Sequence, residues 1–311
     1  MSLAFIFPGQ GSQKIGMLAA AGAAFPVVRE TFAEASAALG RDLWKLAQEG
    51  PESELNLTAN TQPLLLTADV ALWRAWNARQ GTLPAIMAGH SLAEYAALTA
   101  AGALQFADAV RLVADRGRFM QEAVPAGQGA MAAIIGLEDD VVAELCREAA
   151  GGDVLQPVNF NAPGQVVVAG AAAAVERVLA LAASRKARAV KLPVSIPAHS
   201  SLMAPAARRF AQRLQGVEIR APEIPVVHNY HVRIEHDPEA VREALARQLD
   251  SPVRWVETIR TMSERGARTF VECGPGNVLT GLNRRIAKDV PTLSIDTPEG
   301  LAKALATAQE I

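Results

Sequence analysis

The sequence predicts an α/β fold in which a largely parallel sheet carries a second, inserted subdomain. Short apolar runs, typical of buried strands, alternate with longer segments of helical periodicity in the first part of the chain. Between about residues 127 and 196 the predicted order becomes β-α-β-β-α-β, which is typical of a ferredoxin-like unit. After Pro197 the alternating pattern resumes, so the insertion interrupts one larger domain. A chain of 311 residues is long for a single core, which agrees with this division.

The larger domain, expected at residues 1–126 plus 197–311, is built from short apolar strands and longer helices. The strands end at turn-forming residues, and they are expected at Leu3–Phe7, Pro84–Ala88, Ile224–His228 and Thr269–Glu272. Helices are assigned where apolar residues recur every three or four positions: Phe25–Leu39, Gln62–Arg79, Leu92–Ala101, Phe106–Gln121, Ser201–Leu214, Pro238–Leu249, Val253–Arg265 and Val278–Ile286.

The inserted subdomain is expected at residues 127–196. Its four predicted strands are Gly129–Ile135, Val154–Phe160, Gln165–Ala169 and Ala189–Val194. Two helices, Asp139–Ala149 and Ala171–Ser184, complete the ferredoxin-like order. The middle strands are joined by Asn161-Ala162-Pro163-Gly164, whose composition is that of a turn.

Composition excludes several classes of function. The formal net charge of −2 gives no global attraction to nucleic acid or to an anionic membrane. The two cysteines, Cys146 and Cys273, form no motif and indicate free thiols in a reducing compartment. The N-terminus lacks the basic region of a signal peptide, and the apolar stretches are too short to span a membrane. We therefore expect a cytoplasmic protein that contacts neither nucleic acid nor membrane.

Residues 88–98, AGHSLAEYAAL, place Ser91 between an apolar run and a helix. A nucleophile elbow needs small residues two positions before and after its serine, because the chain turns sharply and the helix packs close to the strand. Gly89 and Ala93 meet this need, although the usual pattern has a second glycine. The spacing alone fits a serine that merely caps the helix equally well.

A nucleophilic serine needs a base, and His199 is the candidate among five histidines. It lies where the inserted segment returns to the larger domain, and clefts form at such junctions. His90 directly precedes the serine on a chain that alternates faces, so it is poorly placed. His228, His231 and His236 lie in one polar stretch that suggests an exposed loop. The alternative for His199 is a structural histidine at a chain reversal, and none of the five has metal-ligand spacing.

Arg116 lies on the apolar stripe of its predicted helix, three residues after Val113 and three before Phe119. A buried guanidinium is costly unless an anion meets it, and its planar fork suits a carboxylate. Considered alone, an internal salt bridge to Glu94 or Glu122 is the simpler explanation. The other explanation is a carboxylate of the substrate.

Three further segments carry weaker signals. The loop FPGQGSQ, residues 7–13, lacks the GK[ST] of a phosphate-binding loop. Its N–H groups could still donate to an oxyanion, with Gln10 the best placed. The segment GPGNVL, residues 274–279, is interpreted as a structural turn, and Asn159-Phe160-Asn161 as a strand end that enters a turn.

Taken together, these residues resemble the malonyl-CoA:acyl-carrier-protein transacylase family of bacterial fatty acid synthesis. The resemblance covers nearly the whole chain, and the combination of its motifs in this order is highly specific. The stretches that carry it are FIFPGQGSQ (5–13), TQPLLLTADVALW (61–73), AGHSLAEYAAL (88–98), RGRFMQEAVPAGQGAMAAIIGL (116–137), VNFNAPGQVVVAG (158–170), VSIPAHSSLM (194–203), RQLDSPVRW (247–255) and ECGPGNVLTGL (272–282).

The resemblance implies an α/β-hydrolase-like core with an inserted ferredoxin-like subdomain. It assigns the catalytic serine and histidine to Ser91 and His199, and the malonyl-binding arginine to Arg116. The glutamine whose carbonyl orients the histidine falls on Gln248, which replaces the usual acid of a catalytic triad.

The resemblance also assigns the backbone donors of the oxyanion hole to Gln10 and Leu92. Two positions depart from the family pattern. Ala93 stands where the family usually has glycine, at the contact between strand and helix. Ala198 is one of the residues that line the acyl pocket, and its small side chain leaves the strictness of malonyl selection open.

The implied activity is transfer of a malonyl group from coenzyme A to the phosphopantetheine thiol of acyl carrier protein, through a malonyl-serine intermediate. It requires no cofactor and no metal, and we expect a monomer. Alternatives are a sister transacylase that serves a polyketide pathway or the carrier subunit of malonate decarboxylase, a serine esterase, and a non-catalytic carrier-binding module. Because the family's carrier is acidic, basic residues within 185–188 and 284–288 are candidates for docking. Solvated helix faces explain the same charges equally well.

Overall fold

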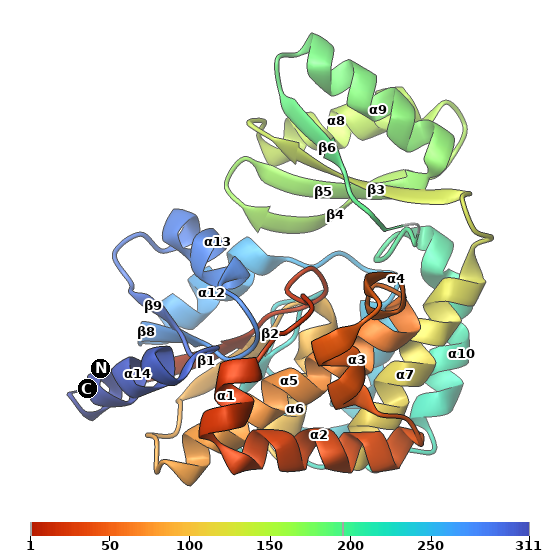
Figure 1. The fold of residues 1–311 in the computed structure, drawn as a ribbon. Coiled ribbons are helices and arrows are strands. Elements are labelled where there is room, and N and C mark those ends of the chain that lie inside the picture. The colour runs from red at the N-terminus through yellow and green to blue at the C-terminus, as the bar shows by residue number, and fades with distance from the viewer. Residues whose placement is uncertain (1, 195, 311) are drawn as a thin grey trace.

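A computed structural model of the chain describes residues 2–194 and 196–310. It contains a five-stranded sheet in a large helical core and a four-stranded sheet in a smaller lobe, as Figure 1 shows. Neighbouring strands are parallel in the first sheet and antiparallel in the second. The predicted α/β fold class is therefore confirmed.

The core sheet has the strand order β7-β2-β1-β8-β9. Its strands are β1 (Ser2–Phe7), β2 (Ile86–Gly89), β7 (Val226–Val227), β8 (Ala267–Glu272) and β9 (Thr292–Ser294). Phe7 pairs with Gly89, so β1 and β2 end together and the segments that follow them leave the sheet at the same edge. Ligand sites of open parallel sheets lie at this carboxyl edge.

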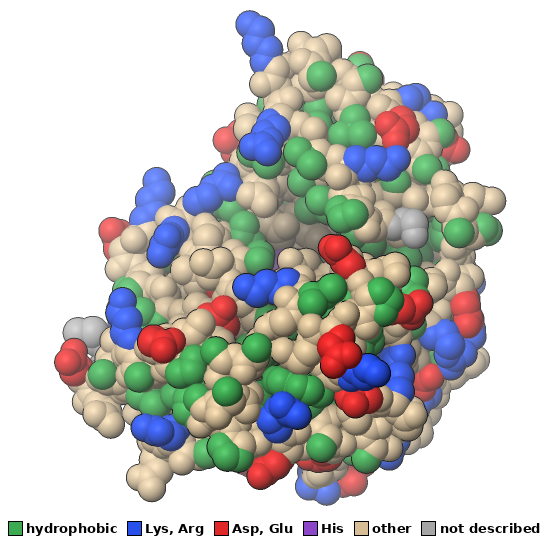
Figure 2. Space-filling view, in the orientation of Figure 1, with side chains coloured by type: hydrophobic (Ala, Val, Ile, Leu, Met, Phe, Trp, Pro, Cys, Tyr) green, Lys and Arg blue, Asp and Glu red, His purple; other side chains and the backbone are tan. Residues whose placement is uncertain are grey.

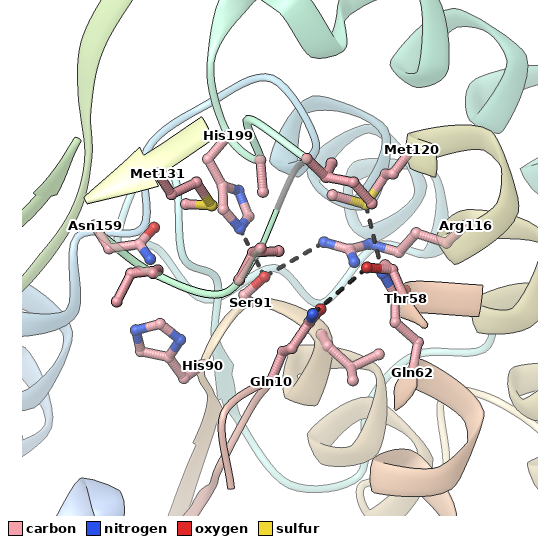
Figure 3. A pocket seen from close by; sticks show the side chains of 15 residues that line it. Gln10, Thr58, Gln62, His90, Ser91, Arg116, Met120, Met131, Asn159 and His199 are labelled. Atoms are coloured by element: carbon pink, nitrogen blue, oxygen red, sulfur yellow. Dashed lines mark hydrogen bonds between the residues drawn. The ribbon is translucent and has the colours of Figure 1, made fainter. Parts of the chain in front are cut away.

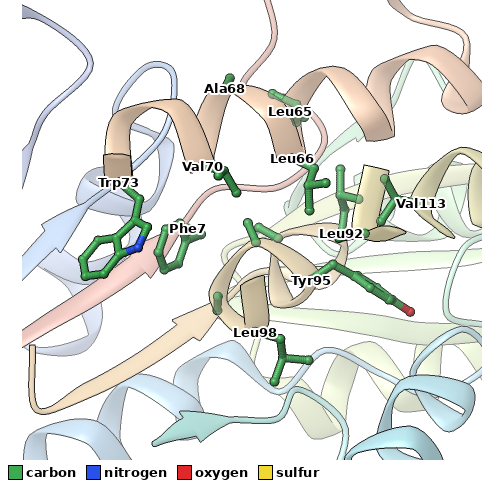
Figure 4. Close-up of a cluster of buried hydrophobic side chains, with 14 of the residues drawn as sticks. Phe7, Leu65, Leu66, Ala68, Val70, Trp73, Leu92, Tyr95, Leu98 and Val113 are labelled. Carbon is green, nitrogen blue, oxygen red and sulfur yellow. The ribbon is translucent and has the colours of Figure 1, made fainter. Parts of the chain in front are cut away.

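Successive residues of β1 point to opposite faces of the sheet, and each face has its own helices. Phe5 and Phe7 pack into the larger apolar cluster, whereas Ala4 and Ile6 pack against α12 (Trp255–Glu264) and α13 (Val278–Ile286). Figure 4 shows the larger cluster, in which α5 lies across the strands. Helices that bury residues there are α1 (Ala19–Ala24), α2 (Pro26–Leu39), α3 (Leu43–Glu49), α4 (Glu52–Leu55), α5 (Thr58–Ala78), α6 (Glu94–Ala100), α7 (Phe106–Ala123), α10 (Ala204–Leu214), α11 (Pro238–Gln248) and α14 (Pro298–Gln309).

None of the helices within the described residues is both long enough and apolar enough to traverse a bilayer.

The small sheet has the strand order β4-β5-β3-β6, as in a ferredoxin-like unit. Its elements are β3 (Gly129–Ile135), α8 (Asp139–Ala150), β4 (Leu155–Ala162), β5 (Gln165–Ala171), α9 (Ala172–Ser184) and β6 (Arg188–Lys191). The two helices cover one face. The other face, which includes Met131 and Val158, is turned toward the core, as Figure 1 shows. The domain limits at residues 127 and 196 enclose these elements and stay a prediction.

The two sheets are joined by main-chain hydrogen bonds between β4 and the segment before α12. The Phe160 N–H donates to the Val253 carbonyl at 2.9 Å, and the Val253 N–H donates to the Val158 carbonyl at 2.8 Å. The predicted helix start at Val253 is therefore wrong, because these groups are engaged by a strand. The helix begins at Trp255.

Other differences lie at the ends of elements. β4 continues through Ala162, so the predicted four-residue turn is reduced to Pro163-Gly164. The strands predicted at 189–194 and 224–228 are shorter, and α1, α3 and α4 were not expected. β9 and α14 follow the last predicted element. The start of α14 has a recognisable signal, since the Thr297 side chain accepts from the Gly300 N–H and a proline follows.

Candidate active site

A cavity lies between the two sheets at the carboxyl edge of the core sheet. The core contributes Gln10, Ser91 and Arg116, and the small sheet contributes Met131 from β3 and Asn159 from β4. Figure 3 shows these side chains directed toward one space, although they come from segments far apart in the sequence. The cleft predicted at the junction of the two lobes is thus present.

Ser91 occupies a sharp turn between β2 and a short 3-10 helix, η1 (Ser91–Ala93). Its φ of 54° is a left-handed conformation that is strained for a residue other than glycine. A Cβ on Gly89 would lie 1.9 Å from the main-chain oxygen of Ala93, so this turn requires glycine before the serine. The Ala93 methyl group is buried in the core cluster. The Ser91 hydroxyl contacts His199 and not a helix N–H, so the geometry is that of an elbow.

His199 presents one ring nitrogen to the serine and the other to main-chain carbonyls. Its Nε2 lies 2.6 Å from Ser91 Oγ. Its Nδ1 lies 2.9 Å from the Gln248 carbonyl oxygen and 3.1 Å from that of Ser251. Because carbonyl oxygens only accept hydrogen bonds, the proton is on Nδ1, and Nε2 accepts from the Ser91 hydroxyl.

Burial keeps this histidine neutral. The His199 side chain is almost fully buried, and burial, assisted by the positive charge of Arg116, lowers the pKa of His199 to about 3. The imidazole is therefore an unprotonated acceptor at neutral pH. A hydroxyl hydrogen-bonded to a neutral imidazole is the arrangement of an activated nucleophile.

Arg116 lies on the buried face of α7, as predicted, and is only 1% exposed. Its Nη2 donates to Gln248 Oε1 at 2.9 Å and lies 3.4 Å from Ser91 Oγ. It makes neither of the salt bridges considered for it: Glu122 pairs with surface arginines, and Glu94 accepts from other groups. Burial lowers the pKa of Arg116, but a guanidinium stays protonated in proteins. The cavity thus holds a positive charge beside the serine hydroxyl.

Two main-chain N–H groups beside Ser91 are available to a ligand. The Ser91 N–H is already engaged by Asn229 Oδ1 at 2.6 Å. The N–H groups of Leu92 and Gln10 have no acceptor among residues 2–194 and 196–310. A Cβ on Gly9 would lie 2.4 Å from the main-chain oxygen of the residue before the serine, so the Gln10 loop packs directly on the elbow. Two N–H groups without acceptors beside a serine hydroxyl are what an oxyanion hole requires.

Comparison with known proteins identifies the family. The model of the acyl transferase domain matches residues 4–297. Malonyl CoA-acyl carrier protein transacylase of Escherichia coli strain K12 is 55% identical over 303 residues, which cover 97% of this chain and 98% of that protein. The chain belongs to the malonyl CoA-acyl carrier protein transacylase family.

Solved structures of the family have the same fold. The transacylase of Coxiella burnetii is 50% identical with a TM-score of 0.97, and the match covers 98% of this chain and 97% of that one. A malonyl-transacylase in complex with the acyl-carrier protein of a type II polyketide synthase, PlMCAT:AntF, is 51% identical, also with a TM-score of 0.97. That match covers 99% of this chain and 100% of the other. Both agree with the α/β core and the small antiparallel sheet described above.

The site residues that the resemblance designates come together in this member of the family. Five of them line the cavity: Gln10, Ser91, Leu92, Arg116 and His199. The sixth, Gln248, lies behind the histidine and contacts it through its carbonyl oxygen. Ala198, next to the histidine, also lines the cavity.

The expectation of an exposed loop is wrong for His228. This histidine is fully buried, and its Nδ1 lies 2.7 Å from Glu94 Oε1. The chain reverses after it, with the His228 N–H donating to the Arg233 carbonyl at 2.9 Å and Val232 in a left-handed conformation. This reversal draws a polar segment of the sequence into the core. His231 is half-buried beside Glu235, and only then does the segment reach the surface.

Sequence analysis also missed two asparagines of β4. Asn159 lines the cavity, and its buried Oδ1 has no donor within the described part of the chain. Asn161 Oδ1 lies 2.8 Å from His90 Nε2. Interpreting this segment as a strand end that enters a turn gave the two asparagines no functional role. Their spacing of two residues, which puts both on one face of a strand, was the signal available.

Proposed function

We propose that this protein transfers a malonyl group from coenzyme A to the phosphopantetheine thiol of acyl carrier protein in fatty acid synthesis. The transfer passes through a malonyl ester on Ser91. Membership of the transacylase family supports the reaction, and the geometry of the cavity supports the assignment of residues.

The observation that best supports malonyl as the acyl group is the position of Arg116. Its guanidinium is buried, lacks a carboxylate partner within the described residues, and lies 3.4 Å from Ser91 Oγ. A malonyl thioester has its carboxylate one methylene away from the carbon that the serine attacks. A carboxylate that close to the reacting carbon matches a cation that close to the nucleophile. An acetyl group would leave the guanidinium without an anion, which costs free energy.

The first half-reaction forms the acyl-enzyme. The Ser91 Oγ–H proton passes to His199 Nε2 as Oγ bonds to the thioester carbonyl carbon. The N–H groups of Leu92 and Gln10 hold the resulting oxyanion, and each donor contributes about 3 kcal/mol in comparable sites. The carbon–sulfur bond then breaks, and His199 returns the proton to the sulfur of the departing coenzyme A.

The second half-reaction repeats these steps with another thiol. The phosphopantetheine thiol of the carrier gives its proton to His199 and attacks the malonyl ester. The ester bond breaks, and His199 returns the proton to Ser91 Oγ. The result is a malonyl thioester of the carrier and the original enzyme, by a ping-pong scheme.

A serine esterase is not favoured. An esterase of this fold would orient its histidine by a carboxylate and would have no need of a buried cation. Here Nδ1 of His199 faces two main-chain carbonyls, and a guanidinium occupies the acyl pocket.

We further propose that the carrier protein approaches the hollow between the lobes, in the cytoplasm. Figure 2 shows this hollow, with Lys and Arg side chains gathered on the α13 side and on the small lobe. Of the predicted docking cations, Arg185 is paired with Glu148, and Arg285 is held by Gln165 and the Pro163 carbonyl. The other basic residues within 185–188 and 284–288 are exposed and suit an acidic carrier.

The proposed function is tested by a transfer assay with purified protein, malonyl-CoA and carrier protein that bears its phosphopantetheine. We expect malonyl-carrier as the product, detected by mass. Carrier without phosphopantetheine is the matched control and should stay unmodified. Release of free malonate at the same rate with and without carrier would identify water as the acceptor and contradict the proposal.

A further inference from the structure

The side chain of Gln248 connects the groups that surround the nucleophile. Its Oε1 accepts from Arg116 Nη2 at 2.9 Å. Its Nε2 donates to Glu94 Oε2 at 2.8 Å and to the Ser91 carbonyl at 3.0 Å. These contacts are separate from the main-chain carbonyl of the same residue, which faces His199. The side chain is 1% exposed, so it is held entirely by protein.

The partners of this amide fix its orientation. Arg116 can only donate, whereas the Glu94 carboxylate and the Ser91 carbonyl can only accept. A reversed amide would set its NH₂ against the guanidinium and its oxygen against two acceptors. The carbonyl end therefore points to the cation and the NH₂ end to the anion, which places one neutral group between two buried charges.

Glu94 accepts hydrogen bonds from three groups other than Arg116. Its Oε1 accepts from His228 Nδ1 at 2.7 Å, and its Oε2 accepts from the Asn229 N–H at 3.0 Å in addition to the amide of Gln248. Asn229 in turn holds the elbow through the Ser91 N–H. The one buried carboxylate near Arg116 among the described residues is thus committed to supporting the turn that bears the serine.

A direct ion pair between Glu94 and Arg116 would satisfy both charges and would leave nothing for the substrate. We propose that Gln248 is a positioning residue that prevents this pairing: its amide holds the Arg116 fork by a neutral contact and keeps Glu94 apart from it. The positive charge then remains available to the carboxylate of the acyl group, and selection of malonyl over acetyl depends on Gln248. This inference rests on the proposed function.

The test moves the buried carboxylate from position 94 to position 248, next to Arg116, without changing the number of buried charges. The double variant Glu94→Gln/Gln248→Glu exchanges the two side chains, so that a carboxylate faces Arg116. Glu94→Gln alone is the matched control. Like the double variant, it removes the carboxylate that accepts from the Asn229 N–H, but it places no carboxylate next to Arg116. The Gln248 carbonyl is retained in both, so the orientation of His199 is preserved.

The measurement is the rate of ester formation on Ser91 from malonyl-CoA and from acetyl-CoA, followed by intact mass, and thermal unfolding checks that each variant folds. Relative to Glu94→Gln, we expect the exchange to lower the malonyl-to-acetyl ratio by about tenfold or more, because Arg116 is already paired. A ratio within about twofold of that control would overturn the inference, since such a difference is small against the selectivity a buried unpaired group confers.

Gln248→Met is the second variant, should the exchange not fold. Methionine has a similar length but makes none of the three hydrogen bonds of the amide, and the ratio should fall because Gln248 no longer holds the Arg116 fork. An unchanged ratio would contradict a positioning role. If the parent protein forms no malonyl ester at all, the proposed function fails, which is distinct from failure of this inference.

Discussion

The two walls of the cavity are built from different chemistry. The core wall carries Ser91, His199 and Arg116, whose polar atoms are linked by hydrogen bonds from the elbow to α11. The wall on the small-lobe side offers mainly apolar side chains such as Met131 and Leu192. Under the proposed function, bond-making and charge recognition belong to the core, and the small lobe shapes the space around the acyl group.

The difference follows from how each wall is supported. The core wall stands at the ends of two adjacent parallel strands, where Phe7 pairs with Gly89, so its loops are fixed by the sheet. The small-lobe wall is one face of an antiparallel sheet, where Met131 packs with Val158 and Val167. Changes on the first wall should alter which chemistry occurs, and changes on the second should alter which shapes fit.

Removing the charge from the core wall is the largest expected effect. Arg116→Ala should lower kcat/KM for malonyl transfer by about 100-fold or more, because a charge-assisted contact to the carboxylate is lost. Acetyl transfer should survive or rise, since acetyl makes no such contact. Arg118→Ala is the matched control on the same helix: Arg118 is half-exposed, paired with Asp115, and outside the cavity. Equal losses of malonyl and acetyl transfer in Arg116→Ala would contradict the carboxylate role.

Enlarging the cavity at the small-lobe wall should change which acyl groups fit and leave the transfer reaction largely unaffected. Met131→Ala opens space beside the acyl group, so a malonyl thioester that carries an extra methyl group should gain on malonyl-CoA by about tenfold, the scale of one methylene in a pocket. Malonyl transfer itself should change only a few-fold, because Arg116 still holds the carboxylate. Competition between the two thioesters gives the ratio directly. If malonyl transfer collapsed while the protein remained folded, the proposed separation of the walls would be wrong.

The pH profile should show the smallest change. Because the pKa of His199 is lowered to about 3, the base is neutral throughout neutral and mildly acidic pH. The rate of acyl-enzyme formation should vary less than twofold between about pH 8 and 5, whereas a histidine of ordinary pKa would lose about 30-fold by pH 5. A fall of that size centred near pH 6.5 would show that the imidazole is not held as described.

The lowered pKa of His199 also makes the stability of the fold depend on pH. His199 has an ordinary pKa near 6.5 when unfolded and a lower one when folded, so the unfolded chain binds a proton first as pH falls. Its contribution to the free energy of unfolding is present above about pH 6.5 and is lost as pH falls toward the folded value.

Much of the fold could be predicted from local patterns, because most of its elements are long enough to show a period. The buried helix face that carries Arg116 was recognised in this way, and the insertion was recognised from its order of elements. Elements without such a signal were missed: β9 has three residues, and the strand pairing of Val253 depends on β4, far away in the sequence. α14 was missed although its threonine cap and proline were present.

The site could be predicted only in part, for a physical reason. Ser91 and His199 carry reactive side chains with recognisable neighbours. The contribution of Gln248 to His199 comes from a main-chain carbonyl, which no residue type encodes, so only the family resemblance indicated it. Glu94 and Asn229 support the elbow from 135 residues apart. Their pairing depends on how the chain reverses after β7, which no local pattern shows.

The central claim is that the imidazole of His199 and the fork of Arg116 act together on an acyl group carried by Ser91. It is tested most directly by intact mass after mixing the protein with malonyl-CoA alone. We predict that the parent gains the mass of one malonyl group and that the peptide containing Ser91 carries it, whereas Ser91→Ala gains nothing. A malonyl adduct of equal yield on Ser91→Ala, or none on the parent, would contradict the claim.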